Sequence, residues 1–519
     1  MKRIFAAAVV AAIFAAISIA APEERTFVRS MERIYVIDPV KSQSAYEARA
    51  VQLMYETILT IDYAARPYRL APGTCEVPEP SADGLRYSLR LVPGAAVTAE
   101  DVAAVFKNLA DPERASPGAW TVKNVKSVRV ADPRTVEVEL HSRSHVFPWL
   151  LAMSNFCVVR ADGSGTGPYN LVSWRKNHEM VFRKNPECPF WKRGANTNAF
   201  DTIRYLFVGD VSTQWLMFLK GETMFLGDIS RDNWDAVITG DGKLDPLLLS
   251  QGIKLYSAPT LETRYIGFNM RDPVVGKNKA LRQALTAAFD FEAWRRFYNG
   301  KIDPMSGPVP TTVEGCLDEP TPFPHDVERA KRLLAEAGYP GGIDPKTGRR
   351  LLLTLLLGSA TQDARESGEL LASFFDRIGV RLELEFCTWS AFLKAVNDGR
   401  MQLYSMAWVA DYPDAENFLQ LFHSRNVSPG ANHSYYVNPE YDAEFDAAMD
   451  SGGAAERNRH WRRCQEILRE DCPWIFTHSS KAFSLVRGGV GNYIPTDFPY
   501  GQEMFLECKA AKGGKETGK

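Results

Sequence analysis

The chain has 519 residues, 45% of them hydrophobic and 24% charged, values typical of a globular protein of two or three domains. Its formal charge of −2 excludes the basic excess that binding to nucleic-acid phosphates needs. We therefore expect no nucleic acid partner.

The first 20 residues predict a secretory signal peptide. Two basic residues precede an apolar run over 4–19, and residues 18–20 form a small-x-small cleavage site. An uncleaved membrane anchor is the alternative, but the run is slightly short for a span of about 20 residues. We expect cleavage near Ala20, which would leave a formal charge of −4. No cysteine lies near the site, so we do not expect a lipoprotein.

Eight cysteines follow this segment, and export to an oxidising space permits disulfides. No CxxC motif is present, so neither a zinc ribbon nor a thioredoxin-like site is indicated. Cys464 and Cys472 are too far apart to bridge if they share one helix. The other pairings cannot be derived from the sequence.

A small α+β unit is predicted over about 59–163. Residues 85–91 alternate as a half-buried strand does, and Thr98 with Asp101 forms the start of a helix. Two strands joined by a turn then form a hairpin that ends at Leu140. The Gly-rich segment 163–171 could suggest a phosphate loop, but it lacks the P-loop lysine and the GxGxxG spacing, so a plain turn is favoured.

Helical periodicity is clear from residue 278 onward. One helix carries Leu281, Ala284, Leu285, Ala288 and Phe289 on a single face. A second helix occupies the segment from 326 to 337, and Gly338 is well placed just beyond its end.

Residues 349–410 have the pattern β-α-β-α-β, with strands at 349–358, 380–386 and 402–410. Such units give parallel strands covered by helices, and ligands bind beyond the carboxyl ends of the strands. Trp389 and Asp411 lie there. A ligand role and a structural role for Asp411 are about equally supported, since Asp414 is the better N-cap of the next helix. Trp389 and Trp408 are either core residues or the lining of a pocket.

The sequence offers no positive case for an enzyme. His141 and His145 have the spacing of a zinc helix, but they follow a strand and no glutamate lies between them, so we expect no metal site. No GxSxG motif and no framed cysteine nucleophile is present. We expect neither catalytic residues nor a cofactor.

Several segments, taken in order, resemble the family 5 extracellular solute-binding proteins of ABC transporters, which include dipeptide- and oligopeptide-binding proteins. They are "YVIDP", "GTGPYNLVSW", "FRKNPECPFW", "YIGFNM", "ALRQALTAAFDFEAW", "ERAKRLLAEAGYP" and "AWVADYPDAENFL", and the similarity spans about 30–500.

The resemblance implies an α/β clamshell, the periplasmic binding protein type II fold. Lobe I would combine 21–58, 164–263 and 478–519; lobe II would be 264–477; the α+β domain 59–163 would be inserted. It also implies a monomeric periplasmic receptor that captures peptides and delivers them to an inner-membrane permease, with domain closure about crossings near 263 and 478.

Ligand-binding residues follow from the same resemblance. The peptide main chain would bond to Gln43, Ser44 and Ala45 on one side and to Trp408, Val409 and Ala410 on the other. Asp411 would pair with the peptide α-ammonium. Trp389 would line a side-chain pocket.

Two departures from the family pattern bear on the ligand. The early helix lacks the usual preceding Asp-Gly pair, and the loop "GSATQD" lacks a basic residue that would clamp the carboxylate of a dipeptide. Longer or variable peptides are therefore favoured. A non-peptide solute such as a sugar or a metal chelate is the alternative, and a secreted hydrolase is a third possibility.

Overall fold

The computed structural model describes residues 25–509 except 43, 193–195, 197, 231–232, 241, 429 and 497–501. The predicted signal peptide and Gln43 lie outside the described residues. Within the described part, no helix is both long and apolar enough to cross a membrane.

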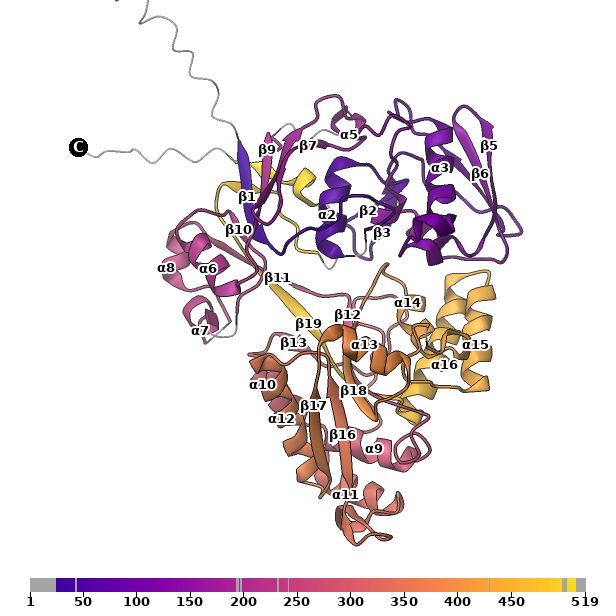
Figure 1. Ribbon diagram of the computed structural model, residues 1–519, viewed down its shortest axis with the longest axis vertical. Coiled ribbons are helices and arrows are strands. Elements are labelled where there is room, and N and C mark those ends of the chain that lie inside the picture. The colour runs from indigo at the N-terminus through magenta and orange to yellow at the C-terminus, as the bar shows by residue number, and fades with distance from the viewer. Residues whose placement is uncertain are drawn as a thin grey trace, which may run out of the picture.

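Two lobes share one 12-stranded sheet (Figure 1). Its main path runs β17-β16-β18-β12-β19-β10-β1-β9-β8-β7, with β11 and β13 paired to β19. The upper lobe contributes β1 (Thr26–Met31), β7 (Tyr169–Arg175), β8 (Glu179–Lys184), β9 (Thr202–Phe207), β10 (Phe225–Leu226) and β11 (Lys254–Pro259). The lower lobe contributes β12 (Glu262–Phe268), β13 (Ile302–Asp303), β16 (Leu352–Leu357), β17 (Arg381–Phe386) and β18 (Leu403–Val409).

The 13-residue strand β19 (Trp474–Val486) belongs to both lobes. Its first part pairs with β12, and its second part pairs with β11 from Lys481 to Val486, antiparallel in both cases. The chain therefore crosses between the lobes beside 260–262 and 478–481, close to the predicted crossings. The residue boundaries of the three domains remain a prediction.

The upper lobe carries α2 (Ala45–Met54) and a set of short helices around its sheet. They are α5 (Pro189–Lys192), α6 (Val211–Leu219), α7 (Trp234–Val237) and α8 (Pro246–Ser250). The chain ends in this lobe with β20 (Val490–Gly491), η8 (Gln502–Phe505) and β21 (Glu507–Cys508). Glu503 is buried there between Arg29 of β1 and Arg49 of α2, at 2.8 and 2.9 Å, and this ties the C-terminal segment to the lobe.

The predicted α+β unit is a three-stranded sheet of order β4-β6-β5 packed on one helix. Its elements are β4 (Arg86–Arg90), α3 (Ala99–Ala110), β5 (Val125–Asp132), β6 (Thr135–Leu140) and α4 (Phe147–Leu150). The predicted start of α3 is confirmed, because Thr98 and Asp101 form a reciprocal capping box. A hairpin of β2 (Leu59–Asp62) and β3 (Arg69–Pro72) joins this unit to the upper lobe.

The lower lobe confirms the β-α-β-α-β prediction. Strand β16 pairs parallel to both β17 and β18, and α12 (Gln362–Asp376) and α13 (Trp389–Asn397) connect them. Gly338 has a φ of +91°, which suits a glycine just after a helix end. The remaining elements are α9 (Lys279–Ala288), α10 (Phe291–Phe297), α11 (Val327–Glu336), β14 (Ile343–Asp344), β15 (Arg349–Arg350), α14 (Glu416–Leu419), α15 (Pro439–Asp450) and α16 (Ala454–Asp471).

The Gly-rich segment before β7 packs against the end of α2. The Gly167 N–H donates to the Met54 carbonyl at 2.8 Å, and a Cβ on Gly167 would lie only 2.5 Å from the Leu53 carbonyl oxygen. A glycine is needed here so that the two backbones can approach closely, which agrees with the predicted turn.

All eight cysteines are unpaired. Burial raises the pKa of the Cys75 and Cys472 thiols to about 12 and that of Cys316 to about 11. Little of the reactive thiolate can form at these positions near neutral pH.

Candidate functional site

Asp411 follows β18 directly and lies at the carboxyl end of a parallel strand, as predicted. It lines a cavity of about 170 Å³ whose other walls come from the upper lobe and the inserted unit. Three parts of the chain that are far apart in sequence therefore meet at this cavity. Its lining residues are Ser42, Ser44, Ala45, Ala48, Ile61, Pro117, Gly118, Trp120, Trp149, Ala152, Met153, Ser154, Asn155 and Asp411.

The start of α2 forms the wall supplied by the upper lobe. Ser44 is the N-cap: its side chain accepts the Glu47 N–H at 3.2 Å, while the Glu47 carboxylate accepts the Ser44 N–H at 3.3 Å. This capping box fixes the direction of the helix. The structure thus brings Ser44 and Ala45 to the same cavity as Asp411.

Asn155 fixes the wall supplied by the inserted unit. Its amide donates to the carbonyls of Pro39 and Ser42 at 2.8 and 3.0 Å, so it holds the loop that leads to α2. Gly118 packs tightly on it, since a Cβ there would lie 2.8 Å from the Asn155 Cγ. The lining of this wall is consequently rigid.

The edge of β18 next to Asp411 is open for main-chain pairing. Strand β16 pairs with β18 only from Leu403 to Ser405, whereas β12 pairs with it as far as Val409. The Ala410 N–H donates to the Leu261 carbonyl at 2.8 Å, on the β12 side. Because backbone groups alternate between the two edges of a strand, those of Val409 point away from β12. Its side chain is 55% exposed.

Asn417 holds the residues around the strand end. Its side-chain oxygen accepts the Trp408 indole N–H at 2.9 Å and the Asp411 main-chain N–H at 3.2 Å. Trp408 is therefore partly buried and anchored rather than free to rotate. The Asp411 backbone is fixed relative to the strand.

Burial raises the pKa of the Asp411 carboxyl to about 6, and the nearby Asn417 amide opposes this rise only in part. The ionised form is destabilised because the surroundings solvate it poorly. A cation placed in the cavity would reverse this effect.

Trp389 lies farther out than the other predicted residues. It is the first residue of α13, its ring is 56% exposed, and it stacks on Phe392 with ring centroids 5.2 Å apart. It does not line the cavity that Asp411 lines. Its role as a pocket residue remains a prediction.

The loop after Asp411 makes a contact between the inserted unit and the lower lobe. The His145 imidazole Nε2 lies 3.3 Å from the Asp414 carboxylate, and both side chains are largely buried. Burial favours the neutral acid at Asp414, but the hydrogen bond and charge of His145 outweigh it, so the pKa of Asp414 is lowered overall. Asp414 also accepts the Glu416 N–H at 2.9 Å. The helix α14 has Ala415 as its N-cap, so the predicted cap position was one residue early.

A second acid lies behind this loop. The Tyr412 hydroxyl donates to the Glu416 carboxylate at 2.5 Å, and burial raises the pKa of Glu416 to about 7. Two raised carboxyl pKa values within six residues mark this as an electrostatically strained region.

Trp120, Trp149, Asn155 and Asn417 were missed in the sequence. None belongs to a motif, and all four become neighbours of the strand end only through tertiary packing. His145 was considered only as a metal ligand. Within the described part of the chain, no group of three or more His, Cys, Asp or Glu side chains could hold a metal ion.

Comparison with known proteins places the chain among bacterial binding proteins. A family model described as bacterial extracellular solute-binding proteins, family 5 Middle, matches residues 69–429. "Heme-binding protein A" of Haemophilus influenzae is 24% identical over 473 residues, 83% of each chain. "Di/tripeptide-binding protein 2" of Pseudomonas aeruginosa is 24% identical over 501 residues, 88% of this chain and 90% of that protein.

The fold prediction is confirmed by a solved structure. HbpA2 from Haemophilus parasuis superposes with a TM-score of 0.79 at 22% identity, covering 93% of this chain and 100% of that one. The two-lobed α/β clamshell with an inserted α+β domain is therefore the architecture of this chain.

The buried charge at Asp411 predicts a variant that is more stable without ligand. The folded-state pKa of about 6 lies above the ordinary value of 3.8, so the native protein binds this proton more tightly than the unfolded chain does. Ionisation above about pH 6 therefore costs stability, and protonation restores it as the pH falls towards 3.8. Asp411→Asn should raise the unfolding free energy by roughly 1–3 kcal/mol above about pH 7 and by little near pH 4.

Chemical denaturation at several pH values measures this difference. Asp318→Asn, which changes an exposed aspartate in the same lobe, is the matched control. A variant at Asp411 that is less stable than the native protein above pH 7 would contradict the account.

The His145–Asp414 contact predicts a second effect. His145→Gln should weaken ligand binding about three- to tenfold, because one hydrogen bond to a charged group is lost from the contact between the inserted unit and the lower lobe. His141→Gln, four residues away on the surface, should leave affinity unchanged. Calorimetry on both variants decides the matter, and equal affinities would show that the contact has no part in binding.

Proposed function

Because the chain belongs to the bacterial extracellular solute-binding proteins of family 5, we propose that it is a periplasmic receptor that captures peptides and delivers them to an ABC permease of the inner membrane. It acts as a monomer and leaves its ligand chemically unchanged. A signal peptide cleaved near Ala20, without lipid attachment, brings it to the periplasm.

The observation that carries the peptide proposal is the state of Asp411. A carboxylate that is destabilised by burial and lies in a cavity is suited to a ligand cation, and every unmodified peptide has an α-ammonium group. The pair would replace the water that Asp411 loses on burial. The relative named as a di/tripeptide-binding protein supports the same ligand class.

The edge of β18 supports an extended peptide. Main-chain groups of Val409 would pair with the peptide in the way that a strand adds to a sheet edge, which gives affinity with little dependence on side chains. Trp408 and Ala410 flank this position, and Ser44 and Ala45 lie across the cavity. Gln43 would extend the opposite wall, and Trp389 would contact a ligand side chain farther out.

Closure would enclose the peptide between lobes I and II, with lobe I made of 21–58, 164–263 and 478–519, lobe II of 264–477 and the inserted domain of 59–163. The crossings beside 260–262 and 478–481 are the natural hinges, since the rest of each lobe is held by its own sheet and core.

A non-peptide solute is the second candidate. It is favoured by the relative named as a heme-binding protein. A solute without an ammonium group would leave the buried Asp411 carboxylate unpaired, and this observation favours the peptide. A secreted hydrolase would need a nucleophile with its base, and the family is one of solute-binding proteins.

Exposure to a mixture of peptides tests the proposed function. The protein is incubated with random peptides of two to nine residues, separated from free ligand and analysed by mass spectrometry. We expect intact peptides with free amino termini to be retained, and the same peptides to raise the melting temperature, because a ligand bound only by the folded state stabilises it.

Hemin, sugars and nickel chelates serve as comparison ligands in the same melting scans. A response to one of these with none to any peptide would replace the peptide proposal by the non-peptide one. Peptide fragments in place of intact peptides would indicate a hydrolase.

A further inference from the structure

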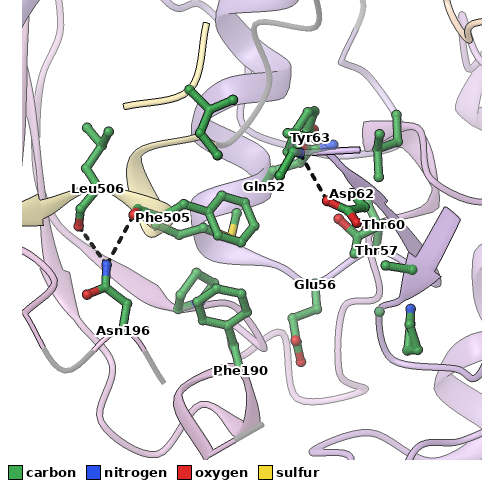
Figure 2. A pocket seen from close by; sticks show the side chains of 18 of the residues that line it. Gln52, Glu56, Thr57, Thr60, Asp62, Tyr63, Phe190, Asn196, Phe505 and Leu506 are labelled. Atoms are coloured by element: carbon green, nitrogen blue, oxygen red, sulfur yellow. Dashed lines mark hydrogen bonds between the residues drawn. The ribbon is translucent and has the colours of Figure 1, made fainter. Parts of the chain in front are cut away.

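The upper lobe holds a second cavity, of about 510 Å³, that Asp411 does not line (Figure 2). Its volume falls in the range of about 300–1,000 Å³ that small-molecule sites occupy. The walls come from the last turn of α2, the β2–β3 hairpin, Phe190 of α5 and the C-terminal segment around Phe505. Nothing in the proposed peptide site uses this space.

Two buried polar side chains line the cavity without a partner. Gln52 is 8% exposed and Thr57 is 7% exposed, and among the described residues neither side chain has a hydrogen bond. Buried polar groups in folded proteins almost always find a partner, because leaving them unpaired costs about 1–3 kcal/mol each. Their position on the cavity wall indicates that the missing partner belongs inside the cavity.

The charge of the lining has one sign. Glu56, Asp62 and Glu507 line the cavity, and no Lys, Arg or His is found among the described residues around it. Glu56 is 9% exposed. An anionic ligand would be repelled and would find no cation to pair with, whereas an ammonium group would be attracted.

Aromatic rings form the opposite wall. Figure 2 shows Phe190 and Phe505 on one side and Thr57, Thr60 and Asp62 on the other. The Phe505 ring lies 5.5 Å from Phe190 and 6.1 Å from Tyr63, in edge-to-face contacts. The Asn196 amide donates to the carbonyls of Phe505 and Leu506 at 3.2 and 2.8 Å and so fixes the backbone of this wall.

We infer that this cavity is a second ligand site, which takes a small aromatic amine. The ring packs against Phe190 and Phe505, the ammonium group lies towards Glu56 and Glu507, and Gln52 and Thr57 hydrogen-bond to the ligand. An aromatic ring with one ammonium group matches both walls, because each wall supplies one of the two chemistries.

The second site is linked to the peptide cavity by α2 and β2. The first turn of α2 lines the peptide cavity through Ser44 and Ala45, and its last turn lines the second cavity through Gln52 and Glu56. Ile61 lines both. An amine that orders this part of the lobe would change peptide affinity, and the coupling would be reciprocal.

Calorimetry with tryptamine tests the inference on the full-length protein. Indole-3-propionate, which has the same ring and the opposite charge, is the matched ligand control. We expect tryptamine to bind and indole-3-propionate not to bind. Ala71→Phe, which fills the cavity from β3, should abolish tryptamine binding and leave peptide binding unchanged.

Gln52→Leu keeps the test decisive if the filled variant does not fold. It should raise the melting temperature of the ligand-free protein, because it removes an unpaired buried amide, and weaken tryptamine binding about tenfold. Asp411→Ala should bind tryptamine as the native protein does. Absence of tryptamine binding at millimolar concentrations overturns the inference. Binding that is lost in Asp411→Ala but survives Ala71→Phe and Gln52→Leu places the amine in the peptide cavity and overturns it equally.

Discussion

The pairing of β19 with both β11 and β12 is the constraint on which the molecule depends. One strand of 13 residues contributes hydrogen bonds to the sheets of two lobes, so the lobes cannot separate without breaking a ladder in one of them. Between the two paired parts only a few residues are free to change their dihedral angles. Motion is thereby restricted to rotation of the lobes about a short segment, and the cavity between them lies where such rotation opens and closes it.

The same architecture explains how a carboxylate comes to be buried at the end of β18. The parallel arrangement of β16, β17 and β18 brings the strand end to the face covered by the inserted unit, and the contacts of Asn417 and Asp414 hold the following loop there. Burial makes the ionised form of Asp411 unfavourable in the absence of a ligand. The resulting loss of stability is the source of selectivity, since only a ligand with a cationic group can remove it.

Local signals in the sequence predicted local features well. The capping box at Thr98, the glycine after α11 and the β-α-β-α-β unit with Asp411 at its strand end were all predicted, because each depends on periodicity or on neighbouring residues. The wall formed by Trp120, Trp149 and Asn155 could not be predicted, since it exists only where the inserted unit docks. The membership of β19 in two lobes was equally hidden, because a strand sequence does not name its partners.

The central claim is that Asp411 takes the α-ammonium of a peptide. The most direct measurement is a cycle in which native protein and Asp411→Ala each bind one peptide in its free and its N-acetylated form. Truncation of one partner of a buried charge pair costs about 2–5 kcal/mol, so each single change should weaken binding at least roughly 30-fold. The account predicts that the second change then adds little, because both disrupt one interaction. Acetylation that weakens binding as much in Asp411→Ala as in the native protein would contradict it.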